Sequence, residues 1–362
     1  MYGNVAIFPM PVSRVNPWSC IIDLEEEPLS KRCWALQERY LSSRTLHFAS
    51  TQIYFECRSD FYPQDRHLKH KDSEDNFKIH RRATAKNNAS PEDAWEHIVR
   101  RYSERYLTVE SDKLPAIGGL AARVSFEQGL NDNPGDEYLA GLWKKNLILD
   151  LVWQTYAGDI KRSTPTSYTA PSWSWASVNE PVVFTGDRDG QSLAVVNDAK
   201  VDLENSGSPF GKVTGGWVHL SGIKLHPCDM DDYDDFYIRE GDARFRVNSH
   251  MDSSRFDLPE MCVADYIDKL SELVAVPLML KSEMVDLPHE NDNSVPGAYF
   301  LLLIASPSRQ DPFRDFPCFR RVGVGYSYIE KLEGNENEAR RRLRDRCMEA
   351  IERGTLEDII IV

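Results

Sequence analysis

Apolar residues recur at two different periods along the chain, and the periods divide it into a helical and a β-rich part. Between residues 90 and 156 they return every three or four positions, which is the spacing of one face of a helix. Beyond Pro171 they alternate or form short continuous runs, which is typical of strands. The pattern therefore predicts an α+β fold with a helical middle segment and a β-rich C-terminal portion.

Three helices are predicted in the middle segment. Ser90 is placed to cap the first and Ser111 the second, because a serine side chain can accept a hydrogen bond from the first turn. The third is apolar nearly all round and is expected to be central. Their apolar positions run from Trp95 to Tyr106, from Leu114 to Val124, and through 139–156.

The C-terminal portion is expected to hold at least six strands and one helix. A charged helix is predicted over about 337–353, with apolar residues four apart and Gly354 to end it. The predicted strands are 217–225, 243–247, 273–280, 299–305, 319–328 and a final one at 358–362.

The first 90 residues show weaker patterns. A short helix or turn is predicted within 30–41, and a half-buried strand at 52–58 with Ile53, Phe55 and Cys57 on its buried face. Apolar residues nearly vanish between 61 and 88, where acids and bases mix, which favours a polar linker over a basic docking patch. We expect three regions, 1–60, 61–90 and 91–362, the last with a single core.

Composition narrows the class of protein. The 362 residues include 43 basic and 57 acidic side chains, giving a formal net charge of −14, which disfavours nucleic acid or an anionic membrane as partner. Seven scattered cysteines form no C-x-x-C pair, as expected of reduced thiols inside a cell. The longest apolar run, 299–305, is too short to span a bilayer. A cytoplasmic protein without metal or cofactor is predicted.

Few residues carry an assignable chemistry. The segment 207–212 (GSPFGK) resembles a phosphate-binding loop, but its spacing is one residue short and an ordinary turn is favoured. The acidic cluster at 229–235 favours a solvated loop over a calcium site because it lacks the turn glycine. His47 and His219 lie among apolar residues and are interpreted as hydrogen-bonded core groups. The segment 172–175 predicts a packed aromatic corner, with a ligand cage as the second interpretation.

Glu38 and Glu56 leave two alternatives open. Each flanks an apolar segment, so the two could form a carboxylate pair for general acid–base catalysis. Alternatively, such a carboxylate pairs with a nearby arginine, for which Arg39, Arg44 and Arg58 are the candidates. If Arg44 holds a buried carboxylate, Arg44→Ala is expected to cost about 1–3 kcal/mol of stability.

The segment 33–48, CWALQERYLSSRTLHF, followed by QIYFEC at 52–57, is far more specific. It resembles the signature that ends the HET (heterokaryon incompatibility) domain of filamentous fungi, roughly W-T-L-Q-E-x-x-L-S-x-R-x-L-x-F and then an aromatic-E-C strand. Further segments are similar to the region that flanks this signature. They are 102–103, 107–108, 111–121, 139–143, 170–177 and 319–323.

The resemblance implies a fold and a role. Residues 1–60 would be the C-terminal part of a HET domain, a TIR-like α/β domain, and Met1 would lie inside it, because the family's opening L-S-Y-x-W-G and W-I-D-x-L-C-I-x-Q segments do not occur here. The implied role is fungal non-self recognition ending in programmed cell death, through contacts with unidentified protein partners. The alternatives are a TIR-like NAD-cleaving hydrolase, for which Glu38 is the only catalytic candidate, and a relic that no longer signals. The implied signature cluster is Trp34, Gln37, Glu38, Arg44 and Glu56.

Overall fold

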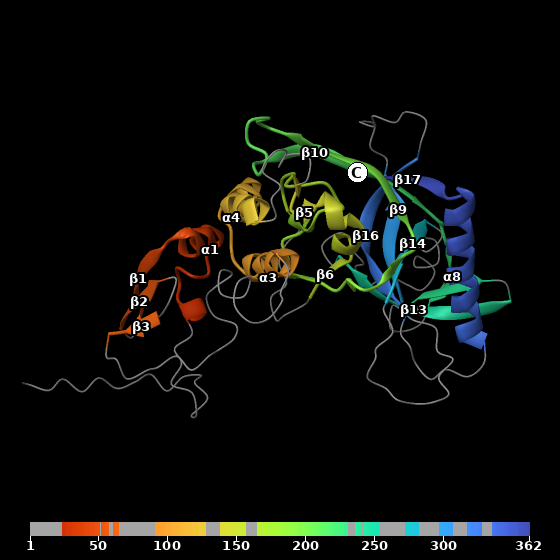
Figure 1. Cartoon of the computed structure of the whole chain (residues 1–362), viewed down its shortest axis with the longest axis horizontal. Helices are drawn as coiled ribbons and strands as arrows, with labels where there is room; N and C mark the ends of the chain where they lie inside the picture. The colour runs from red at the N-terminus through yellow and green to blue at the C-terminus, as the bar shows by residue number, and fades with distance from the viewer. Residues whose placement is uncertain are drawn as a thin grey trace, which may run out of the picture.

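The computed structural model describes residues 24–50, 52–57, 61–64, 91–127, 138–156, 165–230, 236–240, 242–252, 272–281, 297–306, 317–327 and 335–362. These residues form a mixed α+β fold with a large mixed sheet in the C-terminal half (Figure 1). Within them lie five α-helices: α1 (Cys33–Leu41), α3 (Pro91–Ser103), α4 (Pro115–Glu127), α6 (Leu147–Asp150) and α8 (Asn335–Arg353). None of these helices is long and apolar enough to cross a membrane.

The large sheet has ten strands. Its main path runs β11-β12-β13-β16-β15-β14-β8, and β17 joins β16 to the β10–β9 hairpin. Neighbours are antiparallel except β16 and β17, where Cys318 faces Ile360 in a parallel register. The strands are β8 (Gln191–Ser192), β9 (Val195–Leu203), β10 (Val213–Gly222), β11 (Pro227–Met230), β12 (Phe236–Glu240), β13 (Ala243–Met251), β14 (Leu273–Leu280), β15 (Ala298–Ala305), β16 (Cys318–Tyr326) and β17 (Glu357–Ile361).

The central strands of this sheet are buried on both faces. In β14, Val274 and Val276 join one apolar core, while Leu273 and Ala275 join a second core on the opposite face. The first core continues into the helices and reaches from Cys33 to Ile361. Helix α8 covers the second core (Figure 1). Burial on both faces explains why β14 and β15 are continuous apolar runs.

Several predicted elements are confirmed. Helices α1, α3, α4 and α8 lie where their periodicity placed them, and strands β10, β13, β14, β15, β16 and β17 overlap the six predicted strands. Helix α8 buries Ala339, Leu343 and Cys347, and Gly354 follows it at φ +62°, in the left-handed conformation that ends many helices. The linker predicted at 61–90 is described only at its start, where β3 (Phe61–Pro63) lies; the remainder falls outside the described residues.

The third predicted helix, 139–156, is wrong, although its residues are buried as expected. The segment forms two short strands, β4 (Tyr138–Leu139) and β5 (Leu142–Trp143), then α6 and β6 (Trp153–Thr155), which pairs with β7 (Val182–Phe184). Ala140 and Gly141 have φ values of +48° and +101°, which makes a tight β4–β5 turn and breaks a helix. The carbonyl oxygen of Gly141 accepts hydrogen bonds from the indoles of Trp95 and Trp175, both at 2.9 Å, and these hold the turn in place.

A separate three-stranded sheet lies at the end of the molecule opposite α8 (Figure 1). Its order is β1 (Arg44–Phe48), β2 (Ile53–Cys57) and β3, all antiparallel. The predicted strand at 52–58 is confirmed, but its buried face is the opposite of the predicted one. Tyr54 and Glu56 are buried, whereas Ile53, Phe55 and Cys57 face outward and are only half-buried. The reason is that the Glu56 carboxylate is held by charged partners beneath the sheet.

Candidate functional site

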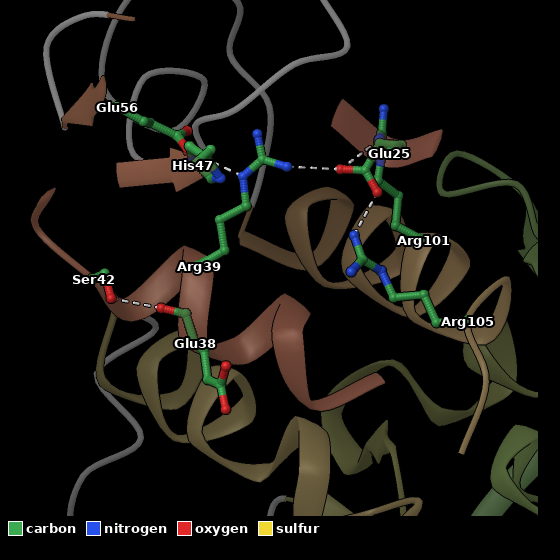
Figure 2. Close-up of polar contacts among 8 residues, drawn as sticks. All are labelled: Glu25, Glu38, Arg39, Ser42, His47, Glu56, Arg101 and Arg105. Atoms are coloured by element: carbon green, nitrogen blue, oxygen red, sulfur yellow. Dashed lines mark hydrogen bonds and ion pairs between the residues drawn. The ribbon is translucent and has the colours of Figure 1, made fainter. Parts of the chain in front are cut away.

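Six charged or polar side chains meet where the three-stranded sheet joins the helices, and we call them the polar seam: Glu25, Arg39, His47, Glu56, Arg101 and Arg105 (Figure 2). They come from the 3₁₀ turn η1 (Leu24–Glu26), from α1, β1, β2 and α3, and from the turn after α3. Every pair of neighbours in the seam joins two different elements. The polar seam therefore holds the three-stranded sheet against the helices through ion pairs.

Arg39 is the centre of this network. Its Nη1 lies 3.1 Å from Glu25 Oε1 and its Nε lies 3.0 Å from Glu56 Oε2, so one guanidinium bridges two carboxylates. Its side chain is 7% exposed and that of Glu56 is 10% exposed. The same Glu56 oxygen lies 2.8 Å from His47 Nε2. Charges this deeply buried are stable only when they are paired, so these groups depend on one another.

Glu25 joins the two arginines of the α3 region to the network. Its carboxylate binds Arg105 Nη2 at 2.5 Å and lies 3.7 Å from Arg101 Nη1. Burial lowers the pKa of Arg105 from its ordinary value, and the Glu25 carboxylate opposes that shift. Burial also raises the pKa of the neighbouring Tyr40 phenol, while the Arg101 charge acts in the other direction. Arginines from α1 and from the α3 region thus share one acidic anchor.

Three of the five signature residues are engaged in specific contacts. The Trp34 indole donates to Asp112 Oδ2 at 3.3 Å, and Gln37 Oε1 accepts a 2.6 Å hydrogen bond from the Gly119 N–H of α4. A Cβ at Gly119 would lie 2.8 Å from Gln37 Oε1, so a larger residue here would displace the Gln37 amide. Glu56, the third, lies in the polar seam. Trp34 and Gln37 therefore fix α1 against its neighbours, with Trp34 still 36% exposed.

The other two signature residues, Glu38 and Arg44, lie apart from the polar seam. Figure 2 shows the Glu38 side chain pointing away from Arg39, and the Glu38 backbone carbonyl accepts a hydrogen bond from Ser42 Oγ at 2.7 Å. Arg44 is exposed at the start of β1 and makes no ion pair with any residue the structure describes. Of the two alternatives for Glu56, the structure selects the arginine partner, Arg39, and places Glu38 outside any carboxylate pair.

A pocket of about 280 Å³ lies next to the polar seam and shares Arg105 with it. The Tyr102 hydroxyl donates to the carbonyl of Lys113 at 2.6 Å, and the Lys113 ammonium donates to the carbonyl of Val178. Burial, followed by the adjacent Cys33, raises the pKa of Tyr102 well above its ordinary value. The lining residues are Cys33, Tyr102, Ser103, Arg105, Tyr106, Leu107, Glu110, Lys113 and Asn179.

The chemistry of this pocket is that of fixed hydrogen bonds. Cys33 donates its thiol to the Tyr102 carbonyl at 3.8 Å, and Tyr102 stays a neutral phenol. Burial alone would raise the pKa of Glu110, but hydrogen bonds from Thr166 and Ser167 outweigh it and leave that pKa below its ordinary value. Glu38 does not line the pocket. The lining that the structure describes thus supplies ligand-binding groups and no nucleophile paired with a base.

A second buried charge lies in the large sheet. The side chains of Arg321 and Asp252 are fully buried, with Nε 3.2 Å from Oδ2. The guanidinium also donates to the carbonyls of Leu151 and Trp153 and lies 3.4 Å from the Trp153 ring centre. The Arg321 N–H donates to Ser172 Oγ at 3.0 Å, which ties β16 to the 170–177 segment. Sequence reasoning missed this residue because nothing in an alternating strand marks one arginine as buried.

The remaining sequence candidates have structural roles. Residues 207–212 form the turn between β9 and β10, as predicted, with the Gly211 N–H bonded to the Ser208 carbonyl. His219 Nε2 lies 2.8 Å from Asp358 Oδ1. Trp173 and Trp175 are fully buried in a packed corner. Of the acidic cluster at 229–235, Asp229 pairs with Arg244, and 231–235 lie outside the described residues. Across the residues that the structure describes, no group of histidines, cysteines and acids could hold a metal ion.

Comparison with known proteins gives no assignment: no family model, no curated protein and no solved structure matches this chain.

Proposed function

We propose that this chain is a heterokaryon-incompatibility-type protein that acts in fungal non-self recognition and programmed cell death through protein contacts. The proposal rests on one observation: segments quoted for the resemblance, far apart in the sequence, meet in direct contacts. Gln37 bonds Gly119, and Ser172 bonds Arg321 across 149 positions. A chance resemblance spread over unrelated surface segments would not be expected to converge in this way.

The nature of the exposed surface supports action by contact. Residues of the signature present Leu46 and Phe48 to solvent, whereas the signature's polar residues Gln37 and Glu56 are turned inward. The one catalytic candidate for the hydrolase alternative, Glu38, is exposed and lies outside the pocket. No feature of the site favours the NAD-cleaving hydrolase over protein contact.

The test is overproduction in a filamentous fungal host, with the chain alone and joined behind the N-terminal part of a HET domain from that host. We expect growth arrest and dye-permeable hyphae with the intact sequence and with Glu38→Gln, but not with Arg321→Met, whose core is disrupted. Normal growth with every version would refute the proposal and favour a relic. If Glu38→Gln alone abolished arrest, and purified protein released nicotinamide from NAD, the hydrolase alternative would take its place.

A further inference from the structure

The outer face of the three-stranded sheet is a continuous apolar surface. By the outer face we mean the side chains of Leu46, Phe48, Ile53, Phe55 and Tyr62. Leu46 lies opposite Phe55, Phe48 opposite Ile53, and Phe55 opposite Tyr62, so all five share one face. Leu46 is 58% exposed, Phe48 79% and Tyr62 53%. Single exposed apolar residues are ordinary, but a cluster of five that covers most of a sheet face, beside Arg44 and Cys57, is typical of an interaction surface.

The outer face ends at an open strand edge. Among the residues that the structure describes, β1 pairs with β2 alone. The Ala49 N–H donates to the Gln52 carbonyl, which makes this pair hydrogen-bonded. Because hydrogen-bonded pairs alternate in an antiparallel ladder, the backbone groups of Thr45 and His47 point toward β2. Those of Arg44, Leu46 and Phe48 therefore point away from the sheet, where another strand can bind.

We propose that a second copy of this chain adds its own β1 to this edge, antiparallel and related by a twofold axis at Leu46. The two sheets then become one six-stranded sheet with a doubled outer face. In this register Leu46 faces Leu46 of the second copy, and Arg44 faces Phe48 of the second copy. A cation beside an aromatic ring is a favourable pair, and the twofold axis makes it occur twice.

Other registers are poorer. A shift by one residue turns the apolar side chains to the wrong face of the combined sheet. An axis at Arg44 sets two like charges opposite each other, and an axis at Phe48 leaves most of β1 unpaired. Arg44 forms no ion pair in the described part of the chain, so its guanidinium is available for this contact. The axis at Leu46 alone pairs all five residues of β1.

The size of the surface indicates a reversible dimer. Five apolar side chains and a five-residue strand fall below the roughly 800 Å² per partner of a standard stable interface. The fraction of dimer is therefore expected to depend on protein concentration. Dimerisation through this edge does not require the proposed cellular role, so the two tests fail independently.

The test is sedimentation velocity of the purified full chain over a micromolar concentration series. We expect the mass to rise from one copy toward two. Leu46→Glu sets two carboxylates across the axis and should weaken association at least about tenfold. Phe48→Glu should retain the dimer, because the introduced carboxylate faces Arg44 of the second copy, and adding Arg44→Glu should abolish it. The matched control is Phe126→Glu on α4, since Phe126 is 61% exposed and is not part of the three-stranded sheet.

A cross-link gives a second measurement that does not depend on weakening the sheet. Residues opposite each other in a hydrogen-bonded pair have Cα atoms about 5.5 Å apart, within disulfide reach. With the exposed Cys228 replaced by serine, Leu46→Cys should therefore form a dimer under mild oxidation, whereas Phe48→Cys and the Cys228→Ser chain alone should not. A chain that is monomeric at every concentration, or equal loss with Leu46→Glu and Phe48→Glu, overturns the proposal. A monomer with slow amide exchange in β1 overturns it as well, because another segment then covers the edge.

Discussion

Replacing Arg39 with methionine tests whether the polar seam holds the three-stranded sheet to the helices. Methionine keeps most of the side chain's length and apolar stem but removes the guanidinium that bridges Glu25 and Glu56. Removing one partner of a buried ion pair costs about 3–5 kcal/mol, because the other charge stays buried without compensation. Glu25 keeps Arg101 and Arg105, whereas Glu56 keeps His47 but loses the one arginine that pairs with it among the described residues. The expected loss is about 2–4 kcal/mol.

The matched control is Arg44→Met, which makes the same change of charge five residues away on an exposed side chain. Because Arg44 has no ion pair within the described residues, this variant should change stability by less than about 0.5 kcal/mol. Among the described residues, Arg39 and not Arg44 is the arginine that pairs with the buried Glu56 carboxylate.

The assay is urea unfolding followed by tryptophan fluorescence and by circular dichroism, with the midpoint compared at equal slope. A double-mutant cycle with Glu56→Gln should give a coupling of about 0.5–3 kcal/mol. Equal urea midpoints for Arg39→Met and Arg44→Met, or a coupling free energy near zero, would refute the conclusion that the polar seam holds the sheet to the helices.

Three further predictions test the rest of the structure. Arg321→Met should cost about 3–5 kcal/mol in the same assay, with Arg321→Lys intermediate because an ammonium cannot bind Asp252 and two carbonyls together; equal stability of the two variants would contradict this. Gly141→Ala should cost about 2–4 kcal/mol, since its φ is +101° and a Cβ would lie 2.5 Å from Trp175 Nε1, whereas Gly354→Ala, at φ +62° in open space, should cost only about 1 kcal/mol. Burial raises the pKa of Cys347 to about 12, so iodoacetamide at about pH 8 should label the exposed Cys228 in native protein and Cys347 only after unfolding, as read by peptide mass spectrometry.

Elements with an unambiguous period could be predicted from the sequence. Helix α8 repeats apolar residues every four positions, and β14 consists of apolar residues interrupted only by Pro277, so both elements could be located from the sequence. The segment 139–156 is apolar nearly all round and fits a buried helix or buried strands equally well. Two residues with positive φ decide between them, and the Trp95 and Trp175 indoles that stabilise the turn lie 46 and 34 positions away. A local pattern does not contain that information.

The candidate site could be predicted only in part, for a related reason. The arginine alternative for Glu56 includes the observed partner Arg39, whereas the partners of Trp34 and Gln37, Asp112 and Gly119, could not be predicted from the signature. The ion pair between Glu25 and Arg105 could not be predicted, because the two residues are 80 positions apart and each by itself has the pattern of a solvated surface charge. The buried face of β2 was predicted wrongly for the same reason. The alternation of apolar and polar residues places the charged face in solvent, whereas the ion pair with Arg39 places Glu56 in the interior.

Because the buried face of β2 is the charged one, the polar seam and the outer face are two sides of the same sheet. Side chains of β1 and β2 alternate between the two faces, so a charged inner face requires that the apolar positions be the outer ones. A sheet fastened by apolar contacts would expose its charges and need no further partner. Here the inner face is held by arginines and glutamates, and the apolar area of Leu46, Phe48 and Phe55 is left for another surface to cover. The ion pairs of Arg39 thus determine where the sheet can bind as well as how it is held.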